Sequence, residues 1–207
     1  MIPVFVTSFG RYEMLHRCIS SLFEFGLNDI TVVDNTGSIG QWWPGVKFVR
    51  SDNRYREQAP WNLGLVPKLL PYIVCDEDIE IDRSTPHDLA SRLLSFANSG
   101  YVKVGLQIRT DDVPEVEHYA HSLEWERSLN ARPVLADGIL MAEVDTHFAI
   151  YRSPYNPGIC GFRLAAPYQC RHLPWYNREF TDEEIDYYRR TGDEWALTHS
   201  AGELCES

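Results

Sequence analysis

Short apolar runs alternate with helical patterns along the first half of the chain. Residues 2–7, 30–33 and 46–49 are almost continuously apolar, which is typical of strands covered on both faces of a sheet. Between the first two runs, apolar residues recur from Met14 to Phe23 with the spacing of one helical face. The order of strand, helix and strand predicts two parallel strands joined by a right-handed crossover.

The second half of the chain also alternates predicted strands and helices, but the spacing of its apolar residues is less regular. Further strands are predicted at residues 73–75, 101–108, 135–141 and 147–151. Further helices are predicted at 61–70, 85–98, 118–129 and from Thr181 onward, where Thr-x-x-Glu forms a capping box. Residues 163–176 mix cations, a histidine and aromatic rings without periodicity, which predicts a loop rich in functional side chains. The whole pattern predicts one α/β domain over residues 1–207, with a mostly parallel central sheet flanked by helices.

Acidic residues gather at the end of the apolar run over residues 73–75. Asp76, Glu77 and Asp78 follow that run directly. Side chains two residues apart in an extended chain point to the same side, so Asp76 and Asp78 can aim at one point. Mg2+ and Mn2+ take oxygen ligands, and Mg2+ often uses one or two carboxylates together with phosphate oxygens and water. The motif therefore fits a metal site, but a solvated acidic turn accounts for it as well.

Two earlier strands also end in polar residues. Thr7 and Ser8 close the first strand, and Asp34 and Asn35 close the second. Ligands of open α/β sheets bind beyond the carboxyl ends of the strands, so these residues are expected to border one pocket with the acidic motif. Asp34 would then accept a hydrogen bond from a base or a ribose hydroxyl. The alternative is a simple turn, because Asp and Asn both favour turns.

Charge and cysteine content narrow the classes of function. The net charge of −11 lacks the basic footprint of a general nucleic-acid binder, so nucleic acid is an unlikely partner, although a local basic patch is not excluded. Five scattered cysteines without a CxxC pair predict reduced thiols. The amino terminus shows no basic segment followed by an apolar one, and no apolar run reaches the roughly 18 residues of a membrane span. A cytoplasmic protein without a membrane span is expected.

The three polar strand ends resemble those of the GT-A fold nucleotide-sugar glycosyltransferases. Residues 4–11, 32–35 and 73–78 carry the resemblance, in matching order and spacing. It implies a Rossmann-like domain with a nucleotide-sugar-binding half at 1–82 and an acceptor and catalytic half at 83–207. It also implies transfer of a sugar from a nucleoside-diphosphate sugar, with a UDP-type donor favoured, to an acceptor that the sequence does not name. The cofactor would be Mn2+ or Mg2+, bound by an Asp-x-Asp motif.

The resemblance also implies roles for individual residues. Thr7 and Asp34 would face the base and ribose, Asp76 would lie near the ribose, and Asp78 would be a direct metal ligand. The predicted donor-binding residues are Thr7, Ser8, Arg11, Asp34, Asn35, Asp76, Glu77, Arg163, Arg171 and Trp175. The predicted metal ligands are Asp78, Asp76, His172 and His199, and the two histidines are otherwise surface or packed side chains. The Glu-Asp pair that often supplies the family's base has no clear counterpart, which leaves Asp145, Asp137 and Glu183 as candidate bases.

Two other functions are compatible with the pattern. A nucleotidyltransferase also places a metal and a nucleotide at strand ends, but usually has a Gly-rich basic loop after the first strand. Residues 8–11 contain a single glycine, which argues against that class. A non-catalytic α/β binding module would leave the acidic run as a solvated turn.

Overall fold

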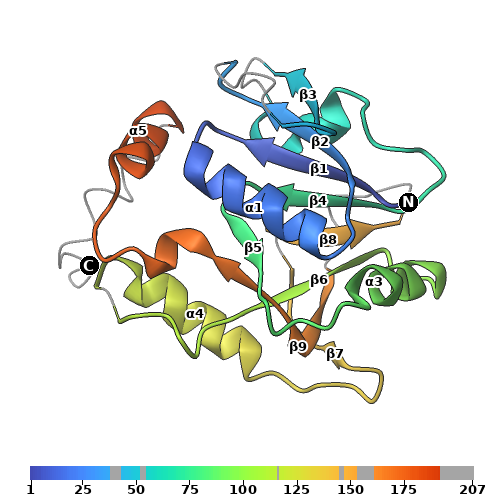
Figure 1. Ribbon diagram of the computed structural model, residues 1–207. Helices are drawn as coiled ribbons and strands as arrows, with labels where there is room; N and C mark the ends of the chain where they lie inside the picture. Colours follow the sequence, from blue (N-terminus) through green and yellow to red (C-terminus); the bar gives the residue numbers. More distant parts are fainter. Residues whose placement is uncertain (38–42, 52–54, 116, 145–146, 153–160, 192–207) are drawn as a thin grey trace.

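The computed structural model describes residues 1–37, 43–51, 55–115, 117–144, 147–152 and 161–191, which form one α/β domain (Figure 1). The strands are β1 (Pro3–Ser8), β2 (Asp29–Asp34), β3 (Lys47–Arg50), β4 (Tyr72–Asp76), β5 (Ile79–Ile81), β6 (Lys103–Ile108), β7 (Ile139–Leu140), β8 (Phe148–Tyr151) and β9 (Phe162–His172). The α-helices are α1 (Tyr12–Glu24), α2 (Ala59–Asn62), α3 (Leu89–Asn98), α4 (Ala120–Asn130) and α5 (Asp182–Thr191). Three short 3₁₀ helices are η1 (Arg56–Gln58), η2 (Glu117–Tyr119) and η3 (Leu173–Tyr176).

The described strands form one mixed sheet in the order β3-β2-β1-β4-β8-β6-β9-β5, with β7 paired to β9. β1, β2, β3 and β4 pair in parallel, and so do β6 and β9. β8 is antiparallel to both β4 and β6, so β6 and β9 run in the direction of β4. Six of the nine strands thus share one direction, and β5, β7 and β8 oppose them. The prediction of an α/β domain with a mostly parallel sheet is confirmed.

Both faces of the first strands are buried, which explains their continuous apolar sequence. Val4 and Val6 of β1 belong to the main core together with Leu15 of α1. Phe5, between them, belongs to a second cluster with Val74 of β4 on the other face. Successive side chains of a strand point to opposite faces, so a strand that is covered on both sides needs apolar residues at every position. Figure 1 shows α1 lying across the front of the sheet.

The predicted loop over residues 163–176 is wrong. Residues 162–172 form β9, the longest strand, which pairs with β5, β6 and β7. Its pairing with β6 shifts register, because Leu164 faces Leu106 whereas Gln169 faces Gln107. The interrupted register and the partly exposed faces remove the alternation of apolar and polar residues that would reveal a strand.

Other boundaries also differ from the predicted ones. Residues 79–81, where no strand was predicted, form β5 opposite β9. The helix predicted at 61–70 is limited to the single turn of α2, and the strand predicted at 135–141 is limited to the two residues of β7. These short elements depend on partners far along the chain, and local patterns do not contain that information.

Asp82, directly after β5, binds two arginines from neighbouring elements. Its carboxylate accepts a hydrogen bond from Arg171 Nε at 2.6 Å and is 3.3 Å from Arg109 Nη1. Burial raises the pKa of Asp82, but hydrogen bonds from Ser84 and Arg171 outweigh it, so the pKa lies below its ordinary value. The ionised carboxylate therefore stabilises the fold at neutral pH, and the stabilisation fades as pH falls below the unfolded pKa of about 4.

Removing this carboxylate tests that assignment. We expect Asp82→Ala to lower the free energy of unfolding at pH 7 by about 2 kcal/mol, because two arginines lose a buried partner. Urea denaturation measures the loss, which should shrink progressively as pH falls from about 4 toward the lowered pKa of Asp82 in the folded protein. Asp111→Ala is the matched control, since Asp111 binds the same Arg109 with a side chain that is 72% exposed; it should cost about 0–1 kcal/mol. Equal losses in the two variants would show that Asp82 is only a surface partner.

Candidate functional site

A cavity of about 610 Å³ opens beyond the carboxyl ends of the central strands. One wall carries Asp76 at the end of β4, Asp78 in the following turn and Tyr187 of α5. A second wall is a face of α4, and His172 and Trp175, from the end of β9 and from η3, also line the cavity. The sheet therefore places its hollow where open α/β sheets bind ligands.

The ends of β1 and β4 are bonded to each other beside this cavity. Thr7 Oγ1 donates a hydrogen bond to Asp76 Oδ1 at 2.9 Å. Ser8 Oγ donates to the Glu77 carboxylate, and the amide of Glu77 donates to the carbonyl of Thr7. The amide of Asn35, after β2, donates to the carbonyl of Ser8 at 2.9 Å. The three polar strand ends thus meet, but Thr7, Ser8, Asp34 and Asn35 are not among the residues that line the cavity.

The three acidic residues after β4 have different environments. Asp76 and Asp78 both line the cavity, so the expectation that they aim at one place is met. Glu77 is fully buried and accepts hydrogen bonds from Ser8, from the amide of Phe9 and from Arg11. Glu77 therefore binds the β1–α1 turn, whereas Asp76 and Asp78 line the cavity.

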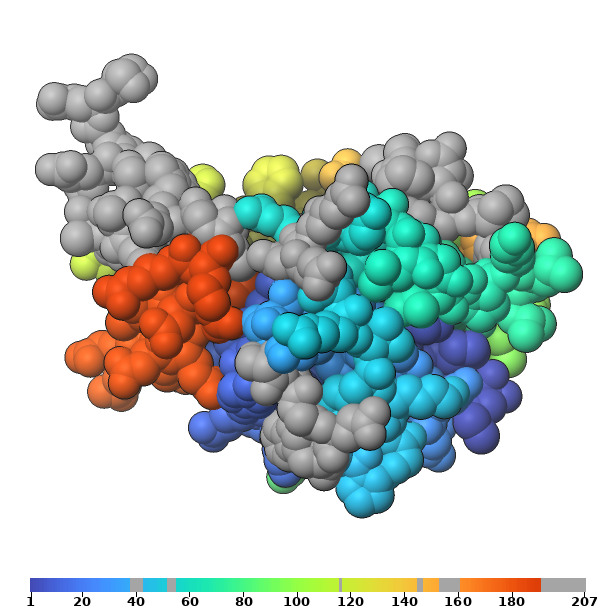
Figure 2. All heavy atoms as spheres, turned by 90° about the horizontal axis from the view of Figure 1, so that it is seen from above, coloured from blue at the N-terminus to red at the C-terminus, as the bar shows by residue number. Residues whose placement is uncertain are grey.

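Arg11 links Glu77 and Asp78 beneath α5. Its side chain is buried, with Nε 2.9 Å from Glu77 Oε1 and Nη2 2.8 Å from Asp78 Oδ2. The guanidinium lies 4.1 Å from the centre of the Tyr187 ring, a cation–π contact. Figure 2 shows α5 in orange-red against the blue amino-terminal residues. α5 thereby covers the arginine and completes one side of the cavity.

The charged groups of this cluster shift one another's pKa values. Burial raises the pKa of Asp78, but Arg11 and His172 lower it by a larger amount. The pKa therefore lies below its ordinary value, and the carboxyl group is ionised. Burial lowers the pKa of Arg11, but Asp78 and Glu77 raise it by more, so the guanidinium stays charged. Burial raises the pKa of Glu77, and Arg11 and Ser8 offset this only in part. The cluster therefore holds an ionised Asp78 carboxylate next to a buried cation.

Two buried polar atoms at the ends of β2 and β3 have no partner among the described residues. Asp34 Oδ1 accepts hydrogen bonds from the amides of Thr36 and Gly37, so Asp34 shapes a turn, which was the alternative to a ligand contact. Within the part of the chain that the structure describes, Asn35 Oδ1 and Ser51 Oγ have no hydrogen-bond partner. Buried polar atoms are normally paired, so these two mark a place for polar groups of a ligand or for water. The sequence analysis did not select Ser51.

The other predicted donor-binding residues divide into two groups. Arg163 lines the cavity, but its guanidinium is bound to the Glu126 carboxylate and to the carbonyl of Glu143. Trp175 also lines the cavity and packs edge-on to the His172 ring, 4.7 Å between ring centres. Arg171 is not among the lining residues, because its guanidinium binds Asp82 and Asp112.

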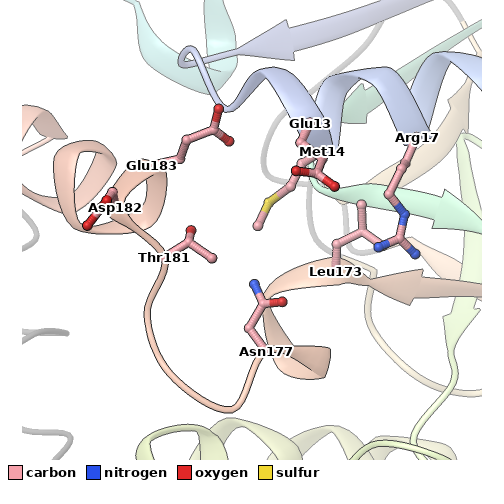
Figure 3. A pocket seen from close by; sticks show the side chains of 8 residues that line it. All are labelled: Glu13, Met14, Arg17, Leu173, Asn177, Thr181, Asp182 and Glu183. Carbon is pink, nitrogen blue, oxygen red and sulfur yellow. The ribbon is translucent and has the colours of Figure 1, made fainter.

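The candidate bases do not meet the acidic strand end. Asp137, in the turn before β7, accepts a hydrogen bond from Tyr101 and does not line the cavity. Glu183 lies in a separate pocket of about 390 Å³ between α1 and α5, where Figure 3 shows it on α5 across from Glu13 and Met14. Asp145, like the predicted metal ligand His199, lies outside the described residues.

Seven residues that line the cavity are not among the predicted site residues. They are Ile108, His121, Ser122, Trp125, Glu126, His147 and Tyr187. The helix predicted at 118–129 places Ser122 and Glu126 one turn apart, but its pattern does not show that Glu126 is buried against Arg163. His147 is buried with Nε2 3.1 Å from the carbonyl of Leu106, and burial lowers its pKa to about 3, so it is neutral.

The acidic end of β4 offers part of a divalent-metal site. Across the described residues, no group of three or more His, Cys, Asp or Glu side chains is arranged to hold a metal ion. Asp76, Asp78 and His172 nevertheless line one cavity, and His172 Nε2 is 3.3 Å from Asp78 Oδ2. Two carboxylates suffice for Mg2+ or Mn2+ when phosphate oxygens and water complete the shell. The donor set therefore fits such an ion together with a phosphate ligand.

Comparison with known proteins finds similarity of fold only. No family model and no curated protein matches the chain. Among solved structures, the mannosyltransferase PcManGT from Pyrobaculum calidifontis, in complex with GDP-Man and Mn2+, is 13% identical, with a TM-score of 0.48 over 97% of this chain and 72% of that one. HddC from Yersinia pseudotuberculosis, complexed with GMP-PN, is 12% identical, with a TM-score of 0.47 over 93% and 99%. A putative glucose-1-phosphate thymidylyltransferase from Bacillus anthracis is 13% identical, with a TM-score of 0.42 over 95% and 83%.

These similarities leave the reaction open. They include a glycosyltransferase and a nucleotide-transferring enzyme, and one backbone arrangement supports many reactions. The side chains of the cavity, and not the fold, therefore indicate the function.

No helix among the described residues is long and apolar enough to cross a membrane.

Proposed function

We propose that the protein is a metal-dependent glycosyltransferase that uses a nucleoside-diphosphate sugar. The observation that supports this most directly is the meeting of Asp76 and Asp78 in one cavity at the carboxyl ends of the parallel strands. The binding of Asp78 by the buried Arg11 supports it further, because the carboxylate is oriented before any ligand arrives. A solvated acidic turn would not need this buried support.

The donor would lie along the ends of β1, β2 and β4. Asp76, Asp78 and His172 would hold a divalent ion, which when bound would act as a Lewis acid on the departing diphosphate. The nucleoside would extend toward Asn35 Oδ1 and Ser51 Oγ, which need polar partners. Three other predicted donor residues would act indirectly, by orienting Asp78. Ser8 bonds to Glu77, Glu77 binds Arg11, and Arg11 binds Asp78.

Glu126 is our candidate to accept the acceptor's proton if the reaction inverts the sugar. It enters the cavity from α4, whereas Asp76 and Asp78 enter from the β4 side. Burial raises the pKa of Glu126 and Arg163 lowers it only in part, which makes the carboxylate a stronger base than an exposed one. Asp137 and Glu183 lie elsewhere, so Glu126 precedes them as a candidate. Asp145 stays a prediction.

Product analysis tests the reaction class. The protein is incubated with Mn2+ and separately with UDP-glucose, UDP-galactose and GDP-mannose, and the released nucleotide is identified by chromatography. A glycosyltransferase releases a nucleoside diphosphate, even when water is the acceptor. Pyrophosphate formation from a nucleoside triphosphate and a sugar phosphate would instead establish a nucleotidyltransferase. Neither product, together with unchanged nucleotide binding in Asp78→Ala, would favour a non-catalytic binding module.

A further inference from the structure

One face of α4 forms the wall of the cavity that the donor residues do not occupy. His121, Ser122, Trp125 and Glu126 all line the cavity. They are spaced three and four residues apart, which places them on one side of the helix. The cavity thus has two chemically different walls, an acidic one beside β4 and a mixed one on α4.

Trp125 is the most unusual residue of this second wall. Its side chain is apolar and large, yet the residue is 59% exposed. In the described part of the protein, no aromatic ring or cation is stacked on its indole. A tryptophan with an open face at the edge of a cavity provides a flat apolar surface, with one N–H donor, for a ligand ring.

The surrounding charges indicate which kind of ring fits. The Glu126 carboxylate is already paired with Arg163, and Asp76 and Asp78 face the same space from the other wall. With one arginine against three carboxylates on the lining, an anionic ligand that is not bound to a metal ion would be repelled. His121 and Ser122 add hydrogen-bonding groups one turn before the indole. A neutral sugar ring has the matching chemistry, because its C–H face is apolar and its edge carries hydroxyl groups.

We propose that the α4 wall is the acceptor subsite and binds a neutral sugar ring stacked on Trp125. This inference rests on the proposed glycosyltransferase function, and it adds the chemical class of the acceptor. A ring on Trp125 lies on the side of the cavity from which Glu126 enters, so an acceptor hydroxyl can approach that carboxylate. The reaction would then build or extend an uncharged carbohydrate.

Saturation-transfer NMR tests the subsite without requiring turnover. The probes are methyl α-glucoside, methyl α-mannoside, methyl β-galactoside and lactose, with glucuronate as the charged counterpart and UDP and GDP with Mg2+ as donor-site probes. We expect at least one neutral glycoside to receive saturation from the wild-type protein. In Trp125→Ala its affinity should fall about tenfold, the ratio expected for one aromatic contact of about 1.4 kcal/mol. UDP and GDP signals should be unchanged.

Two further variants control the experiment. Trp125→Phe retains a flat ring and should keep most of the glycoside signal, whereas Leu135→Ala removes an exposed apolar side chain away from the cavity and should change nothing. The inference is overturned if no neutral glycoside binds, if binding survives Trp125→Ala, or if only nucleobase signals depend on Trp125. If glycosides bind through Trp125 but neither nucleotide binds, the sugar subsite stands and the donor assignment fails.

Discussion

Asp78→Asn should abolish metal-dependent nucleotide binding while leaving the fold intact. The change removes one of the negative charges that line the cavity and keeps the size of the side chain. Arg11 retains its bond to Glu77, so the buried cluster loses one partner and still has its main support. We expect the affinity for a nucleoside diphosphate in the presence of Mn2+ to fall about 100-fold, or about 2.7 kcal/mol, by isothermal titration calorimetry. Without metal, the wild type and the variant should bind equally weakly.

Glu80→Gln is the matched control for this prediction. Glu80 lies two residues further along the chain, but its carboxylate binds Arg17 outside the cavity. Its neutralisation should leave nucleotide affinity within about twofold of the wild type, because a pair this exposed contributes little. Similar losses in Asp78→Asn and Glu80→Gln would mean that total negative charge, and not a specific ligand position, governs binding.

Arg11→Ala should cause the largest loss of stability among the site variants. The truncation leaves the Glu77 carboxylate fully buried without its cation, and it removes the cation–π contact with Tyr187. Breaking a buried pair in this way typically costs about 3–5 kcal/mol, which chemical denaturation at pH 7 would measure. Adding Glu77→Gln to the variant should restore part of the loss, since the uncompensated charge is then gone.

Arg17→Ala provides the comparison, because Arg17 lies in α1, directly after the turn that contains Arg11. Arg17 also pairs with an acidic residue after β4, but its side chain is 44% exposed. We expect a loss of about 0–1 kcal/mol. If Arg11→Ala were as mild as Arg17→Ala, the Arg11 cluster would not hold the strand ends together, and the oriented position of Asp78 would need another cause.

The first half of the fold can be predicted from the sequence because its strands are buried on both faces. The runs at 2–7, 30–33 and 73–75 lie in β1, β2 and β4, and the period of α1 shows its buried face. Strand β9 could not be predicted, because its register against β6 shifts and many of its side chains are only partly buried. Pairing with a strand some 60 residues earlier leaves no local periodicity.

The candidate site divides in the same way. Asp76 and Asp78 could be selected because they follow a recognisable strand, and the structure brings both to one cavity. The environment of Glu126 could not be predicted, since its burial depends on Arg163, 37 residues away. One carboxylate oxygen of Asp34 bonds to its own turn, and the predicted contact of Asp34 with a base or ribose stays a prediction. Chemistry within one strand end can be read from sequence, whereas chemistry between elements requires the fold.

The most direct test of the donor site is thermal melting with UDP, GDP and dTDP, each with and without Mn2+. A ligand present at about 100 times its Kd stabilises the native state by about 2.7 kcal/mol, which is a visible rise in Tm. We expect a rise with at least one nucleotide, and this rise should require Mn2+ and disappear in Asp78→Asn. A rise that persists without metal in the Asp78→Asn variant, or none with any nucleotide, would contradict a metal-dependent donor site at Asp76 and Asp78.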